Sequence, residues 1–139
     1  MAAGRNSLAG IAVDGNRIFI ARRKNSGALG GKWEFPGGKA EPGESLHAAL
    51  IREYMEEFAL AVRVGRHIGS SSFEHSGRLY NLHAYRIFFE TPLSNIQLNE
   101  HSEFKWALLS EIQAMDFAAS DRALLPMLES YLEGERGIN

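Results

Sequence analysis

Acidic side chains gather in one short stretch of this 139-residue chain and limit how that stretch can fold. The chain has 14 Glu and only 3 Asp, and five of the Glu fall within 17 consecutive positions. These five are Glu41, Glu44, Glu53, Glu56 and Glu57. Residues 45–59 contain no Gly or Pro, so they are predicted to form a helix that follows the Gly37-Gly38 loop.

Three carboxylates share one face of this predicted helix. At about 100° per residue, Glu56 lies about 60° to one side of Glu53 and Glu57 about 40° to the other. The opposite side carries the residues predicted to face the core: Ala48, Ile51, Met55 and Phe58. Like charges at this spacing oppose each other by only about 0.2–0.5 kcal/mol per pair. Spacing alone therefore leaves two interpretations, a solvated acidic face with Arg52 as counter-ion or a functional site.

The loop before the helix favours a functional site. Gly37-Gly38 allows the backbone to approach a ligand closely and to point a carbonyl oxygen at it. Carboxylates together with a carbonyl form an all-oxygen site, which suits Mg²⁺ or Mn²⁺. A metal shared between such carboxylates and a polyphosphate neutralises charge that would repel a nucleophile. The loop and helix thus predict a site that cleaves phosphoanhydrides.

The rest of the chain predicts strands around this helix. A hairpin turn at Asp14-Gly15-Asn16 joins the first two strands, and a second turn near Ser76-Gly77 joins a longer pair. The strands are predicted at 7–13, 17–23, 60–73, 78–90 and 103–108, with a glycine-rich loop at 26–31. Ser120 is a candidate N-cap for a last helix running to about Glu133, although Pro126 allows a start nearer Leu125. This order favours an α+β fold or a mixed α/β/α sandwich over repeated βαβ units.

Composition excludes several classes of protein. The chain has no Cys, which removes disulfides, thiolate metal sites and a Cys nucleophile. The five His show no paired metal spacing, so structural or exposed positions are expected for them. A net charge of −2 gives no basic footprint for a nucleic acid polymer, and no apolar run approaches the ~18 residues of a membrane helix. We expect one cytoplasmic domain over residues 1–139, a monomer or homodimer.

The acidic stretch resembles the signature of the Nudix hydrolases. That signature runs Gly, five residues, Glu, seven residues, Arg-Glu, an aliphatic residue, any residue, Glu-Glu, any residue, Gly and an aliphatic residue. Every charged position matches at the family's spacing: Gly38, Glu44, Arg52-Glu53 and Glu56-Glu57. The resemblance implies a Nudix-type α/β/α sandwich with a mixed β-sheet.

Two positions depart from the signature. Tyr54 stands where an aliphatic residue is usual, and Ala59 replaces the last glycine. That glycine serves a helix end that needs positive φ, so Ala59 is expected to cost on the order of 1 kcal/mol there. Neither departure removes a ligand.

The similarity extends beyond the signature. The stretch Gly31–Lys39 is similar to the MutT-like branch, which includes 8-oxo-dGTP diphosphatases and CTP pyrophosphohydrolases. The ADP-ribose branch usually carries a proline some sixteen residues past the signature, and this chain has none between Pro42 and Pro92. The resemblance therefore argues against ADP-ribose as substrate.

The resemblance also implies roles for individual residues. Glu53, Glu56 and Glu57, with the Gly38 carbonyl, are expected to hold Mg²⁺, or Mn²⁺ in its place. Glu53 is the first choice for orienting or deprotonating the attacking water, and Glu100 is the rival. Arg52 is expected to position a neighbouring carboxylate, and Glu44 to brace the loop.

Candidate substrate contacts carry structural alternatives. Arg23 and Arg78 are placed to meet phosphates, or are plain surface charge. The aromatic rings of Phe35, Phe73 and Phe117 can stack on a base, or belong to the core. By resemblance Asp121 reads the base edge, and the alternative is an N-cap or first-turn Asp.

These features together predict a Mg²⁺-dependent nucleoside triphosphate pyrophosphohydrolase. Its expected substrates are 8-oxo-dGTP, CTP or dCTP, or a methylated dCTP, and it would remove damaged or surplus nucleotides. A catalytically silent nucleotide-binding or sensor domain and an ADP-ribose-type Nudix hydrolase remain as alternatives. The intact Arg52-Glu53 and Glu56-Glu57 pairs speak against a silent domain.

Overall fold

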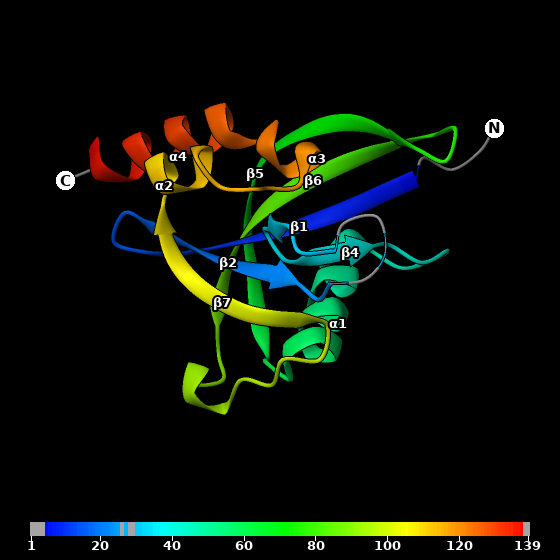
Figure 1. Ribbon diagram of the computed structural model, residues 1–139, viewed down its shortest axis with the longest axis horizontal. Helices are drawn as coiled ribbons and strands as arrows, with labels where there is room; N and C mark the ends of the chain where they lie inside the picture. Colours follow the sequence, from blue (N-terminus) through cyan, green and yellow to red (C-terminus); the bar gives the residue numbers. More distant parts are fainter. Residues whose placement is uncertain (1–4, 26, 28–29, 138–139) are drawn as a thin grey trace.

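The computed structural model describes residues 5–25, 27 and 30–137, and these form a mixed sheet with helices on both faces (Figure 1). The strands are β1 (Arg5–Asp14), β2 (Arg17–Arg23), β3 (Trp33–Glu34), β4 (Gly37–Lys39), β5 (Val62–His75), β6 (Arg78–Phe89) and β7 (His101–Leu108). The helices are α1 (Leu46–Phe58), α2 (Leu109–Gln113), α3 (Ala119–Arg122) and α4 (Leu125–Gly137), with a 3-10 turn η1 (Leu93–Asn95). The α+β class and the mixed sheet predicted from the sequence are confirmed.

Strand β1 organises the sheet. The order along the sheet is β3-β2-β1-β6-β5, with β4 added on β1 and β7 on β2. Strands β1 and β6 run parallel, whereas the other pairings are antiparallel. Residues 5–12 of β1 pair with β6, residues 7–9 also pair with β4, and the last two residues of β1 pair with β2.

Alternation along the central strands produces two cores, one on each face of the sheet. In β2, Ile18 and Ile20 belong to one core while Phe19 and Ala21 belong to the other, as the two-residue period of a strand requires. Helix α4 covers the first core and α1 the second. Because both faces are covered, the strands read as nearly continuous apolar runs.

Most predicted elements appear where the sequence placed them. Both hairpins form, and Gly15 takes the positive φ of 66° that the first turn needs. Helix α1 begins after Ser45, whose side chain accepts a hydrogen bond from the Ala48 amide at 3.1 Å. Of the predicted glycine-rich loop at 26–31, residues 26, 28 and 29 lie outside the described residues.

The end of the chain was predicted wrongly in part. Ser120 lies inside α3, whose N-cap position is Ala118, so Ser120 is not an N-cap. The alternative start nearer Leu125 is confirmed: α4 begins at Leu125, and Pro126 falls in its first turn, where its missing N–H is tolerated. The chain therefore forms two helices, α3 and α4, where one was expected. Helix α4 also continues past Gly134 to Gly137, and α2 was not foreseen.

The buried face of α1 was predicted correctly only at Phe58, which belongs to the core. Ala48 is exposed, and Ile51 and Met55 are 41% and 49% exposed. Ala49, Leu50, Tyr54 and Glu57 are buried in their place. The prediction treated every carboxylate as outward-facing, whereas α1 turns Glu57 toward the sheet. Part of the acidic face is therefore inside the protein.

The C-cap of α1 is strained as predicted. Ala59 has φ 57° and ψ 34°, the left-handed conformation, and its N–H donates to the Met55 carbonyl at 3.0 Å. A Cβ in this conformation costs roughly 1–2 kcal/mol, which a glycine would avoid.

Replacing Ala59 with glycine is expected to stabilise the protein. Ala59→Gly removes the strain but gives the unfolded chain more freedom, so the net gain should be about 1 kcal/mol in the free energy of unfolding. Urea denaturation followed by circular dichroism measures it. The control Ala48→Gly, at an exposed position within α1, should lose up to about 1 kcal/mol. A loss of stability in Ala59→Gly would contradict the strain argument.

Candidate active site

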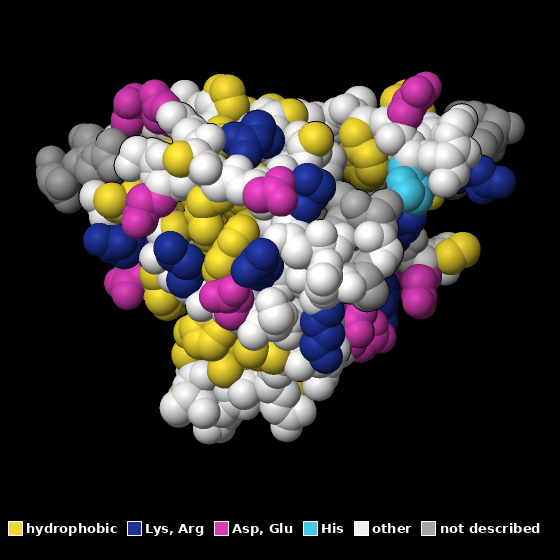
Figure 2. Space-filling model, viewed as in Figure 1, with side chains coloured by type: hydrophobic (Ala, Val, Ile, Leu, Met, Phe, Trp, Pro, Cys, Tyr) yellow, Lys and Arg dark blue, Asp and Glu magenta, His cyan; other side chains and the backbone are white. Residues whose placement is uncertain are grey.

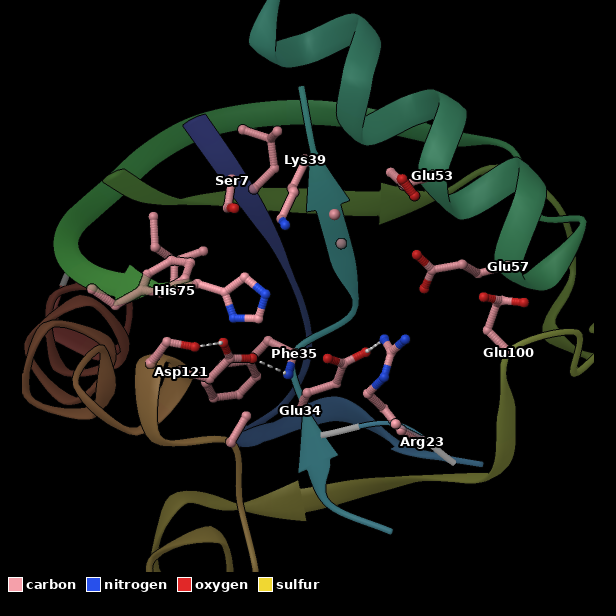
Figure 3. Close-up of a pocket in the computed structure, with 18 residues that line it drawn as sticks. Ser7, Arg23, Glu34, Phe35, Lys39, Glu53, Glu57, His75, Glu100 and Asp121 are labelled. Atoms are coloured by element: carbon pink, nitrogen blue, oxygen red, sulfur yellow. Dashed lines mark hydrogen bonds and ion pairs between the residues drawn. The ribbon is translucent and has the colours of Figure 1, made fainter. Parts of the chain in front are cut away.

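The loop before α1 and the helix itself border a cavity of about 420 Å³ (Figure 3). At Gly38 an added Cβ would lie 2.3 Å from the Glu53 carboxyl carbon, and at Gly37 it would lie 1.8 Å from the Leu8 carbonyl oxygen. Any side chain at Gly38 would displace the Glu53 carboxylate. Both positions therefore require glycine, because the backbone of Gly37 lies against that of Leu8 and the backbone of Gly38 lies against the Glu53 carboxylate.

Glu53 and Glu57 form the carboxylate end of the cavity. Both come from α1 and line the cavity, and Glu57 is only 5% exposed (Figure 3). Burial raises the pKa of Glu57 to about 10, helped by the negative charges of Glu34 and Glu53. Burial also raises the pKa of Glu53. Two neighbouring carboxyl groups with raised pKa values tend to keep a proton unless a cation takes its place.

Arg52 fixes this end of the helix to the preceding loop. Its guanidinium donates to both Glu44 oxygens, at 2.7 and 3.0 Å, and to the Lys39 carbonyl at 3.1 Å. The bond from Arg52 lowers the pKa of Glu44 to about 2. Arg52 also donates to Glu53 and Glu56 at 3.2 Å each. These contacts are compatible with the roles expected of Arg52 and Glu44. Neither of the two residues is among those that line the cavity.

Glu34, on β3, joins the carboxylate end to the opposite wall. Its Oε2 accepts from Arg23 at 3.2 Å and lies 2.8 Å from His101 Nε2. Glu34 is 8% exposed and His101 is fully buried at the start of β7. Glu100, next to His101, lines the cavity near Glu57 (Figure 3).

Phe35 and Asp121 lie at the other end of the cavity. The Phe35 amide donates to Asp121 Oδ2 at 2.8 Å, and the Ser120 hydroxyl donates to Oδ1 at 3.3 Å. Burial, with the nearby charge of Glu34, raises the pKa of Asp121 to about 7. Asp121 lies in the first turn of α3 with its carboxyl group facing the cavity.

The structure brings most of the predicted site residues together. Eight of them line the cavity: Arg23, Phe35, Gly38, Glu53, Glu57, Phe73, Glu100 and Asp121. Besides Arg52 and Glu44, three others do not: Glu56 is exposed, Arg78 lies at the exposed start of β6, and Phe117 is buried against the ring of Phe35 at 4.9 Å between centroids.

Some cavity residues were missed by the sequence analysis. Lys39 lies over the Tyr80 ring at 4.7 Å, and His75 points into the cavity from the end of β5 (Figure 3). Glu34 and Lys39 belong to the Gly31–Lys39 stretch, which was the available signal for them. His101 was expected to be structural or exposed, because only helical spacing between histidines was searched for.

The donor set fits a divalent cation. Glu57 Oε1 is buried, and no hydrogen-bond donor from residues 5–25, 27 and 30–137 reaches it. Among the described residues, Glu34, Glu57 and His101 also form a group whose ligand atoms lie within 4.8 Å of one another and could hold a metal ion. A cation beside Glu57 would partner its orphaned oxygen and relieve the repulsion with Glu53.

Comparison with known proteins agrees with this geometry. The model of the NUDIX domain matches residues 5–128. The chain belongs to the NUDIX family. The Nudix signature residues are those that form the carboxylate end of the cavity and its Arg52 clamp, and the protein is a Nudix hydrolase of the MutT-like kind.

Two relatives match over almost their whole length. The CTP pyrophosphohydrolase of Escherichia coli is 35% identical over 127 residues, which cover 90% of this chain and 89% of the relative. The putative 8-oxo-dGTP diphosphatase 2 of Mycobacterium tuberculosis is 32% identical over 130 residues, covering 91% and 89%.

Solved structures share the fold. The solution structure of the E. coli ORF135 protein has a TM-score of 0.77 at 33% identity, covering 93% of this chain and 89% of that one. The MutT protein of Methanosarcina mazei has a TM-score of 0.79, covering 91% and 94%, and its 24% identity shows the fold alone. Within the described part of the Nudix chain, no helix is long and apolar enough to cross a membrane.

Replacing the buried Glu57 carboxyl group should weaken metal binding without destabilising the metal-free fold. Glu57→Gln is expected to keep or raise the melting temperature of the EDTA-treated protein, because an amide replaces a carboxyl group crowded by two others. It should also lose most of the rise in melting temperature that Mn²⁺ gives the wild type. Scanning fluorimetry with EDTA and then MnCl₂ measures both effects. Glu129→Gln, on the exposed side of α4, should keep the full rise. An undiminished Mn²⁺ effect in Glu57→Gln would exclude Glu57 as a ligand.

Proposed function

We propose that this Nudix hydrolase cleaves nucleoside triphosphates to a nucleoside monophosphate and pyrophosphate in a Mg²⁺-dependent reaction. The proposed substrates are 8-oxo-dGTP, CTP or dCTP, or a methylated dCTP, and the proposed role is clearance of damaged or surplus nucleotides. The observation that carries the proposal is that one cavity has two chemically different ends. Carboxylates gather at one end, and an aromatic ring beside a hydrogen-bonding carboxyl group lies at the other.

The carboxylate end suits the polyphosphate. Bound to Glu53, Glu57 and the Gly38 carbonyl, a divalent cation supplies charge neutralisation for the phosphates. Arg23 lies beside Glu34 at the cavity wall, where its guanidinium can donate to phosphate oxygens. Glu53 or Glu100 orients the attacking water and accepts its proton, since both carboxylates line the cavity. Glu56, exposed on α1, is proposed to bind the cation directly or through a bound water.

The opposite end suits a base. Phe35 offers a ring and a backbone N–H, and Asp121 offers a carboxyl group whose pKa of about 7 allows either protonation state near neutrality. The ionised carboxylate accepts from an exocyclic amine such as that of cytosine, whereas the protonated form can also donate, as an oxidised guanine would need. The two relatives described above bear names for both substrate types.

A turnover panel tests the proposal. The wild-type protein would be incubated with Mg²⁺ and each of 8-oxo-dGTP, the common NTPs and dNTPs, 5-methyl-dCTP and ADP-ribose, and the products would be separated by chromatography. Monophosphate and pyrophosphate from one or two triphosphates are expected. Cleavage of ADP-ribose alone would overturn the substrate class, and no cleavage with Mg²⁺ or Mn²⁺ would favour a binding domain.

Removal of the water-activating carboxylate should reduce turnover strongly. Glu53→Gln is expected to lower kcat by about 10²–10⁴, roughly 3–5 kcal/mol of barrier, with little change in nucleotide binding. Glu100→Gln, measured in parallel, assigns the general base to whichever variant shows the larger loss. Steady-state kinetics and equilibrium binding measure the two effects. Near-wild-type kcat in both variants would reject general-base catalysis by either residue.

If Asp121 reads the base, the preference between two substrates should change with pH as Asp121 titrates. Its pKa of about 7 in the folded protein means that the accepting, ionised form gains population as the pH rises through 7. The kcat/KM for a cytosine triphosphate should therefore rise between about pH 6 and pH 8, relative to that for 8-oxo-dGTP. Asp121→Asn, which does not titrate, should flatten this ratio. An unchanged ratio in wild type across that range would exclude Asp121 as the reader of the base.

A further inference from the structure

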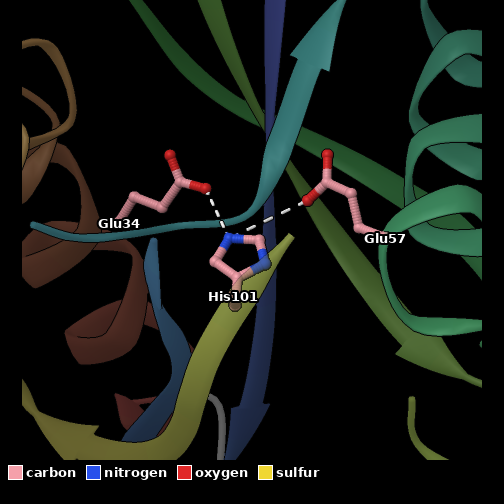
Figure 4. A group of neighbouring side chains, drawn as sticks. All are labelled: Glu34, Glu57 and His101. Atoms are coloured by element: carbon pink, nitrogen blue, oxygen red, sulfur yellow. Dashed lines mark hydrogen bonds and ion pairs between the residues drawn. The ribbon is translucent and has the colours of Figure 1, made fainter. Parts of the chain in front are cut away.

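His101 lies between two buried carboxyl groups. Its Nε2 lies 2.8 Å from Glu34 Oε2 and 4.0 Å from Glu57 Oε1 (Figure 4). Glu34 comes from β3, Glu57 from α1 and His101 from β7, so three elements distant in sequence meet at one imidazole. Phe58 stacks on the His101 ring, with centroids 5.0 Å apart and an interplanar angle of 15°, which holds the ring in place.

The surroundings of the two ring nitrogens are unequal. Nε2 faces a carboxylate oxygen at hydrogen-bond distance, whereas the buried Nδ1 has no hydrogen-bond partner among the residues that the structure describes. A proton on Nδ1 would be a buried donor without an acceptor, which costs about 1–3 kcal/mol. A bare Nε2 would in addition point its lone pair at the Glu34 oxygen. Both considerations place the proton on Nε2.

We propose that His101 is a positioning residue, a fixed Nε2–H donor that holds Glu34 in place for the substrate, and is not itself a metal ligand. A metal bond at Nε2 would require the lone pair there and would move the proton to the orphaned Nδ1. The group Glu34, Glu57 and His101 thus contributes the Glu57 oxygen to a cation, while His101 acts through Glu34. The effect on catalysis rests on the function proposed above.

Both hydrogen bonds that described side chains make to Glu34 converge on one of its two carboxylate oxygens. Oε2 accepts from both Arg23, at 3.2 Å, and His101, at 2.8 Å. Oε1 remains for the cavity that Glu34 lines. His101 therefore also limits where the Arg23 guanidinium can lie, because Arg23 and His101 share one acceptor. Loss of the imidazole should loosen both Glu34 and Arg23 and weaken substrate binding more than metal binding.

Nitrogen NMR of the wild-type protein tests the tautomer directly. With ¹⁵N-labelled histidine, long-range ¹H–¹⁵N spectra of the metal-free protein are expected to show His101 as the Nε2–H tautomer, unchanged on adding Mg²⁺. Addition of ¹¹³Cd²⁺ should produce no coupling to the His101 nitrogens. A proton on Nδ1, or coupling between ¹¹³Cd and Nε2, would overturn the proposal. This measurement needs neither substrate nor turnover.

Two variants test the positioning role. His101→Leu removes the donor and is expected to raise KM for the hydrolysed triphosphate about tenfold, with a smaller change in kcat and a Mn²⁺ dissociation constant within about threefold of wild type. His101→Gln, whose amide nitrogen can take the place of Nε2, should recover most of the KM. A Mn²⁺ affinity weakened tenfold or more in both variants, or a KM unchanged in His101→Leu, would overturn the proposal.

The tests also separate this proposal from the proposed function. Thermal melts of both variants establish that they fold, and the matched control His47→Ala alters an exposed histidine on α1 outside the cavity. Absence of hydrolysis by the wild type would defeat the proposed function alone, because the NMR spectra and the Mn²⁺ titration would still decide whether His101 is a donor or a ligand.

Discussion

The electrostatics of the site depend on one feature, the burial of the Glu57 carboxyl group beside Glu53. A buried carboxyl group opposes its own ionisation, and a second one beside it strengthens that opposition. The raised pKa of Glu57 and its orphaned oxygen both follow from this arrangement. A divalent cation beside Glu57 would partner this oxygen and offset the repulsion between the two carboxylates. The same packing that buries Glu57 therefore favours a bound cation.

The five residues from Glu34 to Gly38 connect the two ends of the cavity. Glu34 contacts Arg23 and His101, the Phe35 amide contacts Asp121, and the Gly38 backbone lies against Glu53. Because the contacts come from consecutive residues, a shift of this segment would alter both ends together. For the proposed triphosphate substrates, such a coupling would link recognition of the base to alignment of the phosphates, although the two groups lie at opposite ends of the substrate.

Local signals in the sequence were sufficient for most of the fold and for half of the site. The hairpins, the capped helix α1 and the strain at Ala59 follow from turn residues, Ser45 and the motif spacing, all of which act over a few residues. His101 and Glu34 are 67 residues apart and meet only through the sheet, so no local pattern indicates their contact. The face of α1 was misjudged because a polar residue was assumed to be exposed, whereas a functional carboxylate can be buried.

The unusual Tyr54 shows how the site tolerates departures from the family signature. Its side chain is fully buried between α1 and the sheet, and its hydroxyl donates to the Gly10 carbonyl at 3.3 Å. A Cβ at Gly10 would lie 2.7 Å from this ring, so the glycine on β1 makes room for the larger side chain. Tyr54 and Ala59 both lie outside the cavity lining. The residue types at positions 54 and 59 therefore affect how α1 packs and ends. They do not change the carboxylates of α1 that line the cavity.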